Sequence, residues 1–545
     1  MFCCKPLWLV LSHSPTEPPR PHPTHQYDLF VINLVLRLLR DEYPHYTASG
    51  ALHALEGSVA SAALFGSIFG QLVAGSLADV WGRKILFVTT ALLITVGSIG
   101  SAFCTDLPEF TIYGQIACWR FFLGAGVGGE YPLAATVTSE SSSASSRGRL
   151  MSAVFAMQGV GALISVLIVL FCLGSGFSPG FAWRFSLAFG SVPALVAFPW
   201  RLRMHETETF ERVKNERKLA AADVNDADAQ QQQQQQHNGS NNNNNTSKYG
   251  ALSSGDSVQQ SAFSARWREI VNAFRLYKWH MLGTASSWFL LDVVFYANGL
   301  FNHDVTSLIL SKGQHTTASE DAWNSAFICA MGLPGYGLSF LFIDQVGRKN
   351  IQLMGFLVMG LLFCICGYGH DWFLGEAATA NEGSGARQWL FLFLYSLTFL
   401  FSNFGPNTTT FVIPGEIYPA NVRATAHGLS AASGKFGAAA GAYFFPMMLG
   451  PGGSSNPTPE GLRAAMITCG LVAWLGAFVT FWFTPRYGAE QLEDEDNYLQ
   501  LEHACLQPPP EEFKTLLSSN SAYQMVEMVH VVDTVDSYVD DAPSI

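Results

Sequence analysis

Eleven apolar segments long enough to cross a lipid bilayer, and a twelfth that is shorter, constrain this chain more than any other feature. A helix needs about 20 predominantly apolar residues to span a hydrocarbon core of about 30 Å. The short segment covers residues 27–40, and the long ones cover residues 57–78, 85–104, 112–136, 149–173, 181–200, 281–301, 323–343, 350–370, 388–414, 424–449 and 462–484. Only 13% of the 545 residues are charged, against roughly 25% in soluble domains. We therefore expect an all-α membrane protein with twelve helices, and we exclude a soluble enzyme.

Two duplicated patterns divide these segments into halves. The sequence GRK at Gly82–Lys84 follows the second segment and recurs at Gly347–Lys349 after the eighth. A Glu–Arg pair with the same spacing then occurs in each half, as Glu140 with Arg147 and Glu416 with Arg423. Two homologous halves are typical of transporters that bind their cargo near the bilayer midplane. We expect one six-helix half at 27–200 and a second at 280–485.

The remaining regions are predicted to lie outside the membrane. Residues 1–26 form an atypical, Pro-rich N-terminal segment, and we expect a truncated or mis-spliced first helix there rather than a re-entrant segment. Residues 201–279 include Gln and Asn runs that predict a disordered linker, and residues 486–545 form an acidic tail. Because positively charged loops stay on the cytoplasmic side, we predict that the linker and both termini are cytoplasmic.

Several polar side chains lie inside apolar segments, where an ionisable group is costly and indicates a functional site. Trp288, Asp292 and Tyr296 recur at intervals of four residues, which places them on one helix face. Lys435 would need a counter-anion, which a bound anion would supply. Glu130 is a further candidate, with a packing pair to Arg120 as the alternative.

Three other features of the membrane segments have a more modest interpretation. The GxGxGG run at Gly124–Gly129 superficially resembles a dinucleotide-binding motif, but it lies in a membrane segment, so we interpret it as close helix packing. Gln158 is either an interhelical hydrogen-bonding residue or part of a site. Asn407 follows Pro406, which frees backbone groups that a cavity could use. Together these side chains favour a small oxyanion over a hydrophobic drug.

Four sequence blocks carry a resemblance to a known family. GGEYPLAATVTSE, GRLMSAVFAMQGVG, WFLLDVVFY and FGPNTTTFVIPGEIYPANVRATAHGLSAASGKFGA resemble the phosphate:proton symporters of the major facilitator superfamily, which include fungal and plant phosphate transporters. The resemblance covers about residues 27–485 apart from the linker. It implies a twelve-helix major facilitator fold of two six-helix halves.

The resemblance also implies roles for individual residues. Phosphate binding would involve Tyr131, Gln158, Trp288, Asp292, Tyr296, Asn407 and Lys435. Proton coupling would involve Asp28, Glu130 and Asp292. The chain departs from the family pattern in having Glu130 where the family has aspartate, and His25 where it has the first acid of an Asp-x-Tyr-Asp motif. An acid expected early in the third helix is also absent from residues 85–104.

A set of charged and glycine residues at one end of the helices is predicted to form a cytoplasmic gate. Its charge pairs would latch the halves together and break in each transport cycle, the alternative being that these residues only set the topology. The predicted gate consists of Asp79, Gly82, Arg83, Lys84, Glu140, Arg147, Asp344, Gly347, Arg348, Glu416 and Arg423.

We therefore expect a secondary active transporter that imports inorganic phosphate with protons by alternating access. The alternatives are a sugar or organic-ion carrier of the same superfamily, a sodium-coupled phosphate carrier, and a receptor that binds phosphate without transporting it. The expected partners are phosphate, protons and the lipid bilayer of the plasma membrane. We predict no enzyme activity, cofactor, metal or nucleic acid, and the sequence indicates no oligomeric state.

Overall fold

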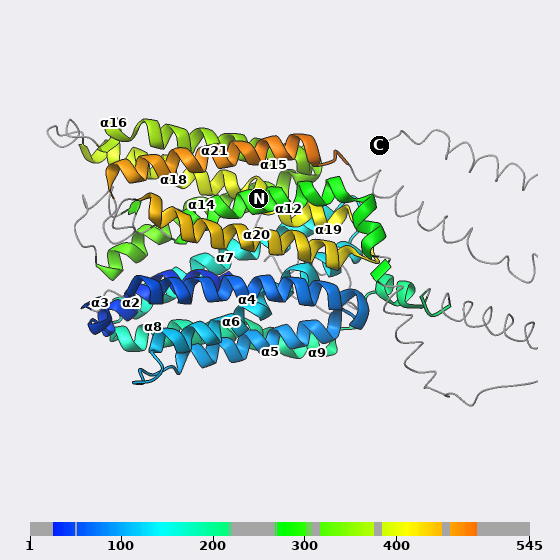
Figure 1. The fold of residues 1–545 in the computed structure, drawn as a ribbon, viewed down its shortest axis with the longest axis horizontal. Coiled ribbons are helices and arrows are strands. Elements are labelled where there is room, and N and C mark those ends of the chain that lie inside the picture. The colour runs from blue at the N-terminus through cyan, green and yellow to red at the C-terminus, as the bar shows by residue number, and fades with distance from the viewer. Residues whose placement is uncertain are drawn as a thin grey trace, which may run out of the picture. The chain divides into compact units, whose positions relative to one another are not determined.

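The computed structural model describes residues 26–48, 52–215, 217–219, 267–268, 270–300, 302, 305–306, 317–374, 384–449 and 458–487 (Figure 1). These residues belong to one compact unit, which spans residues 1–488. The predicted tail lies outside the described residues apart from 486–487, as do residues 1–25 of the N-terminal segment and the Gln and Asn runs of the linker.

The secondary structure of the described residues is helical. The first half comprises α2 (Gln26–Glu42), α3 (His45–Ala48), α4 (Leu52–Trp81), α5 (Arg83–Ala102), α6 (Ile112–Glu140), α7 (Arg147–Gly174), α8 (Pro179–Phe189) and α9 (Ser191–Arg203). The second half comprises α12 (Lys278–Leu300), α14 (Ala318–Val346), α15 (Arg348–Tyr368), α16 (His370–Leu374), α18 (Ser384–Asn403), α19 (Pro406–Glu416), α20 (Arg423–Met448) and α21 (Pro459–Phe483).

These helices make twelve crossings, as predicted. Two crossings are interrupted helices, because α8 and α9 form one span and α18 and α19 form another. Judged by length and composition alone, eight spans of the described residues could cross a membrane. The other four crossings are α2, which has 17 residues, and α6, α12 and α20. These last three carry the buried charges of the predicted site, which explains their lower apolarity.

Helix termini follow local sequence signals. The N-cap hydroxyls of Thr111, Ser178, Thr317 and Thr458 each accept a hydrogen bond from a backbone N–H three residues later, at the starts of α6, α8, α14 and α21. These caps satisfy N–H groups that have no partner within the helix. The two GRK sequences lie in the turns that follow the C-terminal ends of α4 and α14. We call that end of the bundle the GRK end.

The glycines of the predicted packing run lie at close helix crossings. A Cβ added at Gly124 would collide with the carbonyl oxygen of Ala63 on α4, and one at Gly128 would collide with that of Ser67. The same run faces α5 through Gly126, where a Cβ would meet Ile94. Small residues thus allow α6 to pack tightly on α4 and α5.

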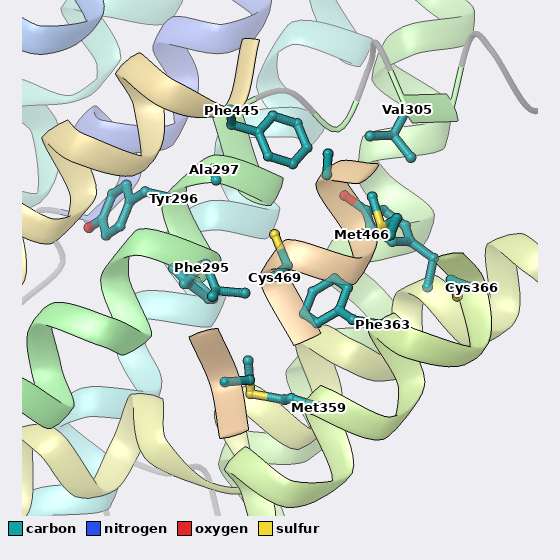
Figure 2. Close-up of a cluster of buried hydrophobic side chains, with 14 of the residues drawn as sticks. Phe295, Tyr296, Ala297, Val305, Met359, Phe363, Cys366, Phe445, Met466 and Cys469 are labelled. Carbon is teal, nitrogen blue, oxygen red and sulfur yellow. The ribbon is translucent and has the colours of Figure 1, made fainter. Parts of the chain in front are cut away.

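The buried apolar side chains form several clusters, one of which joins the two halves through Tyr131 and Trp288. In the second half, Phe363, Met359 and Cys469 pack together between α15 and α21 (Figure 2). Figure 2 shows that Tyr296 of α12 turns its hydroxyl away from this cluster. Its ring therefore belongs to the core while its polar atom points elsewhere.

The first residues of the predicted linker include helical segments and contacts to the helix bundle. Residues 201–203 end α9 and residues 208–215 are helical. Glu206 accepts from the backbone N–H groups of Arg83 and Lys84 at 2.9 and 3.0 Å, which caps α5. Arg217 donates to the carbonyl oxygen of Asp79 at 2.9 Å. It also donates to the carbonyl oxygen of Asn421 at 3.2 Å. The described residues of this stretch therefore contact both halves of the bundle.

Candidate functional site

A buried polar cluster centres on the ammonium group of Lys435. It donates to Asp292 Oδ2 at 3.0 Å and to the Tyr296 hydroxyl at 2.8 Å. It also lies 5.2 Å from the ring centroid of Tyr131. All four side chains are at most 4% exposed. A lone ammonium at this depth is stabilised by the carboxylate and by the electron-rich faces of the two phenol rings.

Glycines bring α20 close enough to α12 to form this cluster. A Cβ at Gly437 would collide with the carbonyl oxygen of Phe289, and one at Gly441 would collide with that of Val293. A Cβ at Gly434 would likewise collide with the ring of Trp288. The GKFG and AAAG sequences around Lys435 thus position its side chain next to Asp292.

The first half covers this cluster from the other side. Tyr131 of α6 contributes its ring, and Phe30 of α2 stacks on Tyr296 with 6.2 Å between ring centroids. Trp288 lies against Tyr131, with 6.2 Å between their ring centroids. The Lys435 cluster is therefore enclosed between the two halves.

A second polar group surrounds the break between α18 and α19. The Asn407 amide donates to the Tyr336 hydroxyl at 3.0 Å and to Asn403 Oδ1 at 2.7 Å. The backbone carbonyl of Asn403, which the break leaves without a helical partner, accepts from the hydroxyls of Ser339 and Thr408 at 2.8 and 2.7 Å. Side chains thus satisfy the backbone group, and the Asn407 amide is left to face Tyr336.

A cavity of about 60 Å³ lies between the two halves, and Tyr336 forms part of its wall. Polar lining is supplied by the predicted Gln158 and by Asn33, Asn302, Ser325 and Asn403, with rings of Phe30, Phe295 and Tyr336. Gln158 Oε1 is buried and has no hydrogen-bond partner. The cavity does not reach Lys435, so the structure separates Gln158 from the Lys435 cluster.

Glu130 and Asp28 lie apart from the cluster, inside the first half. Glu130 accepts a short hydrogen bond from Arg201 of α9 and one from Thr90 at 3.4 Å. Arg120 instead donates to the backbone oxygen of Asp28 at 3.0 Å. The pairing of Glu130 with Arg120 that we considered from the sequence is therefore wrong, because the two side chains face different helices.

At the GRK end, the first half forms a buried charge network. Arg83 contacts Glu140 at 2.6 Å and Asp79 at 3.8 Å. Asp79 Oδ2 also accepts from the backbone N–H and hydroxyl of Thr425 at 3.0 and 2.7 Å. Since Thr425 lies in the first turn of α20, a carboxylate of one half caps a helix of the other.

The second half repeats this arrangement. Arg348 contacts Glu416 through two hydrogen bonds of 2.9 and 2.8 Å, and Asp344 at 2.8 Å. Asp344 also pairs with Arg149 in the first turn of α7, at 3.0 Å. The predicted gate charges therefore form two related networks, each of which reaches into the opposite half.

The remaining predicted gate residues lie at turns and helix starts of the same end of the bundle. Gly82 and Gly347 have φ values of 99° and 88°, which favour glycine at the turns before α5 and α15. Arg423 donates to the carbonyl oxygen of Tyr418 at 2.8 Å. Arg147 is buried at the start of α7, and Lys84 contributes its backbone N–H to the Glu206 cap.

Sequence reasoning missed several residues that the structure places in these clusters. Tyr487, just after α21, donates to Glu416 Oε2 at 2.8 Å. Burial raises the pKa of its phenol well above the usual value, and the nearby Glu416 carboxylate acts in the same direction. Tyr336 and Asn403 were also missed. Their only sequence signals were a tyrosine between two glycines and an asparagine four residues before Asn407.

On the opposite side of the cluster from the GRK end, the halves also touch. The Asn33 amide donates to the carbonyl oxygen of Gly299 at 3.1 Å. Arg37 lies 3.9 Å from Asp321 of α14. The Lys435 cluster therefore has contacts between halves on both sides.

Comparison with known proteins identifies the family. The family model described as "Sugar (and other) transporter" matches residues 24–498. This chain belongs to that family of the major facilitator superfamily. The fold agrees: the proton:xylose symporter XylE bound to 6-bromo-6-deoxy-D-glucose superposes with a TM-score of 0.63 at 20% identity, over 86% of this chain and 96% of that one.

Plant phosphate transporters are among the similar curated proteins. The low affinity inorganic phosphate transporter 5 of Petunia hybrida is 32% identical over 509 residues, which cover 87% of this chain and 89% of that protein. The probable inorganic phosphate transporter 1-6 of Arabidopsis thaliana is 34% identical over 464 residues, which cover 79% and 85%. This membrane carrier thus spans most of the length of these relatives.

Proposed function

We propose that this carrier imports inorganic phosphate together with protons by alternating access. The observation that carries the proposal is the buried Lys435 ammonium, enclosed between the halves beside a carboxylate and two phenols. Relatives of matching length are named as inorganic phosphate transporters. A single cation among neutral hydrogen-bond donors suits a small oxyanion better than a sugar, which has no negative charge for Lys435 to bind.

Phosphate would bind by replacing part of the Asp292 contact to Lys435. Its oxygens would accept from the ammonium and from the hydroxyls of Tyr131 and Tyr296, as charge-assisted hydrogen bonds. Asn407 and Trp288 would supply further N–H donors. Gln158, which lines the neighbouring cavity, would bind phosphate on its way to or from Lys435.

Protons are required because phosphate is an anion. Moving one negative charge into a cell costs about 2.3 kcal/mol per 100 mV of membrane potential. One proton per monoanion removes this cost, and two or more would make the membrane potential favour entry. Asp292 would accept one of them, which neutralises its charge and frees Lys435 for phosphate. Loss of that proton would restore the carboxylate and expel the anion.

Asp28 and Glu130 remain proposed proton carriers of the first half. Asp28 accepts a hydrogen bond from Ser98 at 3.2 Å, and its second oxygen is buried without a partner. That free oxygen supports a role for Asp28 in taking up a proton. Glu130 would have to leave Arg201 to do so.

Alternating access would use the two sets of contacts between the halves. The Asp79–Thr425 and Asp344–Arg149 contacts would open toward the cytoplasm. The Asn33–Gly299 and Arg37–Asp321 contacts would open toward the outside. We propose the plasma membrane as the location, with the GRK end and both termini in the cytoplasm, because positive loops remain on that side.

Uptake by purified protein in liposomes tests this function. We expect labelled phosphate to accumulate when the outside is acidic, and to remain at equilibrium when only a sodium gradient is imposed. Excess unlabelled phosphate should compete, whereas xylose, glucose or choline should not. Competition by a sugar but not by phosphate would replace our proposal with the sugar-carrier alternative. Phosphate binding without any flux would indicate a receptor.

A further inference from the structure

His427 of α20 is a buried titratable side chain with no role in the proposed function so far. The ring is 0% exposed. Its Nε2 lies 3.1 Å from the carbonyl oxygen of Phe411 on α19, so a neutral ring donates a hydrogen bond there. Nδ1 is buried and has no hydrogen-bond partner. Buried polar atoms are seldom left unpaired without a functional reason.

The position of His427 connects the Lys435 cluster to the GRK end. It precedes Lys435 by eight residues of α20, a rise of about 12 Å, and follows Arg423 by one turn. The ring of Trp288 packs edge-on against His427 with 5.5 Å between centroids, and it also contacts Tyr131. Trp288 therefore lies between His427 and the cluster that would hold phosphate.

The carboxylates of the surrounding helices already have donor partners. They are Asp79 of α4 with Thr425, Glu130 of α6 with Arg201, Asp292 of α12 with Lys435, and Glu416 of α19 with Arg348. The charges of the described part of α21 lie in its first turns, at Glu460 and Arg463, toward the other end of α20. These acids are thus engaged with other groups, while Nδ1 of His427 has no hydrogen-bond partner.

We propose that His427 carries one of the protons that accompany each phosphate, held on Nδ1 between the Lys435 cluster and the GRK end. The proposal rests on the proposed function. An N–H bond forms at Nδ1 when the ring takes a proton from water reaching the site from the loading side. It breaks when the halves part at the GRK end and the proton passes to water there.

Phosphate and this proton would favour each other's binding. Imidazole exchanges protons close to neutral pH, but a charged ring in this apolar setting needs an anion nearby. Phosphate at Lys435 would supply that negative charge, and the imidazolium would in turn stabilise the anion. Coupling of this kind is reciprocal by thermodynamic necessity.

The test compares wild type with His427→Gln in liposomes. Glutamine removes the titratable ring but retains an amide N–H that can donate to Phe411. Phosphate self-exchange at equal pH requires no net proton movement. At saturating phosphate, where a weaker affinity does not limit the rate, we expect the variant to keep this exchange within about threefold of wild type. We expect net uptake driven by a pH gradient to fall about tenfold. The charge moved per phosphate should fall by one elementary charge. His280→Gln, which removes an imidazole near the start of α12, should change none of these quantities.

An unchanged charge per phosphate in His427→Gln would overturn the proposal. If that variant does not fold, nitrogen NMR of wild-type protein labelled at histidine provides the second measurement. Adding inorganic phosphate at mildly acidic pH should then protonate one buried ring, and the absence of any such change would also overturn it. A failure of the proposed function looks different, because wild type itself would then exchange no phosphate.

Discussion

At the scale of single residues, the buried charge of Lys435 between the two halves has one carboxylate partner among its described contacts. Lys435 has Asp292 as its counter-ion at 3.0 Å, so any anion that binds there competes with the carboxylate. This competition links the charge state of Asp292 to the affinity for phosphate. Glu130 is different, because its guanidinium partner Arg201 comes from the same half.

We predict that Asp292→Asn separates binding from accumulation. Asparagine resembles the protonated acid in shape and charge, so phosphate should bind within about threefold of wild type or more tightly. Concentrative uptake should fall at least about tenfold, because the site can no longer become negative and expel the anion. Calorimetry and liposome uptake check the two parts. Asp371→Asn, at a carboxylate that is 75% exposed, is the control. Wild-type accumulation by Asp292→Asn would contradict this scheme.

We predict that Glu130→Gln destabilises the protein. The change leaves Arg201 buried without its counter-charge, which typically costs about 3–5 kcal/mol. The double variant Glu130→Gln/Arg201→Met should recover most of this loss, as measured by thermal unfolding in detergent. If the double variant is no more stable than the single one, the pair does not have the structural role we assign. The charge moved per phosphate by the double variant then tests Glu130 as a proton carrier.

At the scale of elements, close helix pairs determine where the polar groups lie. Small residues allow α20 to contact α12 through backbone atoms at Gly437 and Gly441. They also allow α20 to contact α4 of the other half, because a Cβ at Gly428 would collide with the Gln71 carbonyl oxygen. One helix therefore supplies Lys435 to the site and also forms part of the boundary between the halves.

We predict that Gly441→Val separates α12 from α20. The side chain would collide with the Val293 carbonyl oxygen, and overpacking of this kind typically costs about 1–3 kcal/mol. Lys435 should move relative to Asp292, so phosphate affinity should fall together with the melting temperature. Gly385→Val, where a Cβ would meet nothing within 4 Å, is the matched control. A normal affinity in Gly441→Val would show that the crossing does not position Lys435.

At the scale of the whole molecule, the ion pair that joins the halves at Asp344 is modest in energy. Asp344 and Arg149 form an ion pair whose side chains are 16% and 50% exposed, and such pairs are typically worth about 0.2–1 kcal/mol. Weak latches suit a carrier, because the halves must separate and close again in every cycle. Stronger contacts would hold one conformation.

We predict that Asp344→Ala and Arg149→Ala each open the GRK end. Backbone hydrogen exchange in the first turns of α7 and α20 should accelerate, by up to about fivefold. Asp344→Ala should have the larger effect, because Asp344 also contacts Arg348 at 2.8 Å. Adding Arg149→Ala to Asp344→Ala should change little, because the contact between the two residues is then already lost. Fully additive acceleration would mean that the two residues act separately.

We also predict that Tyr487→Phe weakens closure at the GRK end. The change removes the hydrogen bond to Glu416 but keeps the ring beside Arg348. A hydrogen bond to a charged group is worth about 1.5–3 kcal/mol. Because burial raises the pKa of the phenol, it stays protonated through neutral pH and the effect should not vary between pH 6 and about 9. Exchange of the Glu416 region with solvent measures the loss, and unchanged exchange would refute the role of Tyr487.

The sequence alone determined the twelve crossings, because long apolar segments must satisfy their backbone groups as helices in a bilayer. It also indicated the face formed by Trp288, Asp292 and Tyr296, since helical spacing is a local property. The GRK repeats likewise identified the charges that the structure joins into two networks.

Only the tertiary structure decided which of these groups are partners. Glu130 pairs with Arg201 rather than Arg120, and Arg217 binds backbone carbonyls of both halves. Both outcomes depend on contacts between segments far apart in the chain. The same reason explains why Tyr336, Tyr487 and the unpaired nitrogen of His427 escaped the sequence analysis. Spacing along a helix gives the direction of a side chain, but the neighbouring helices decide what it meets.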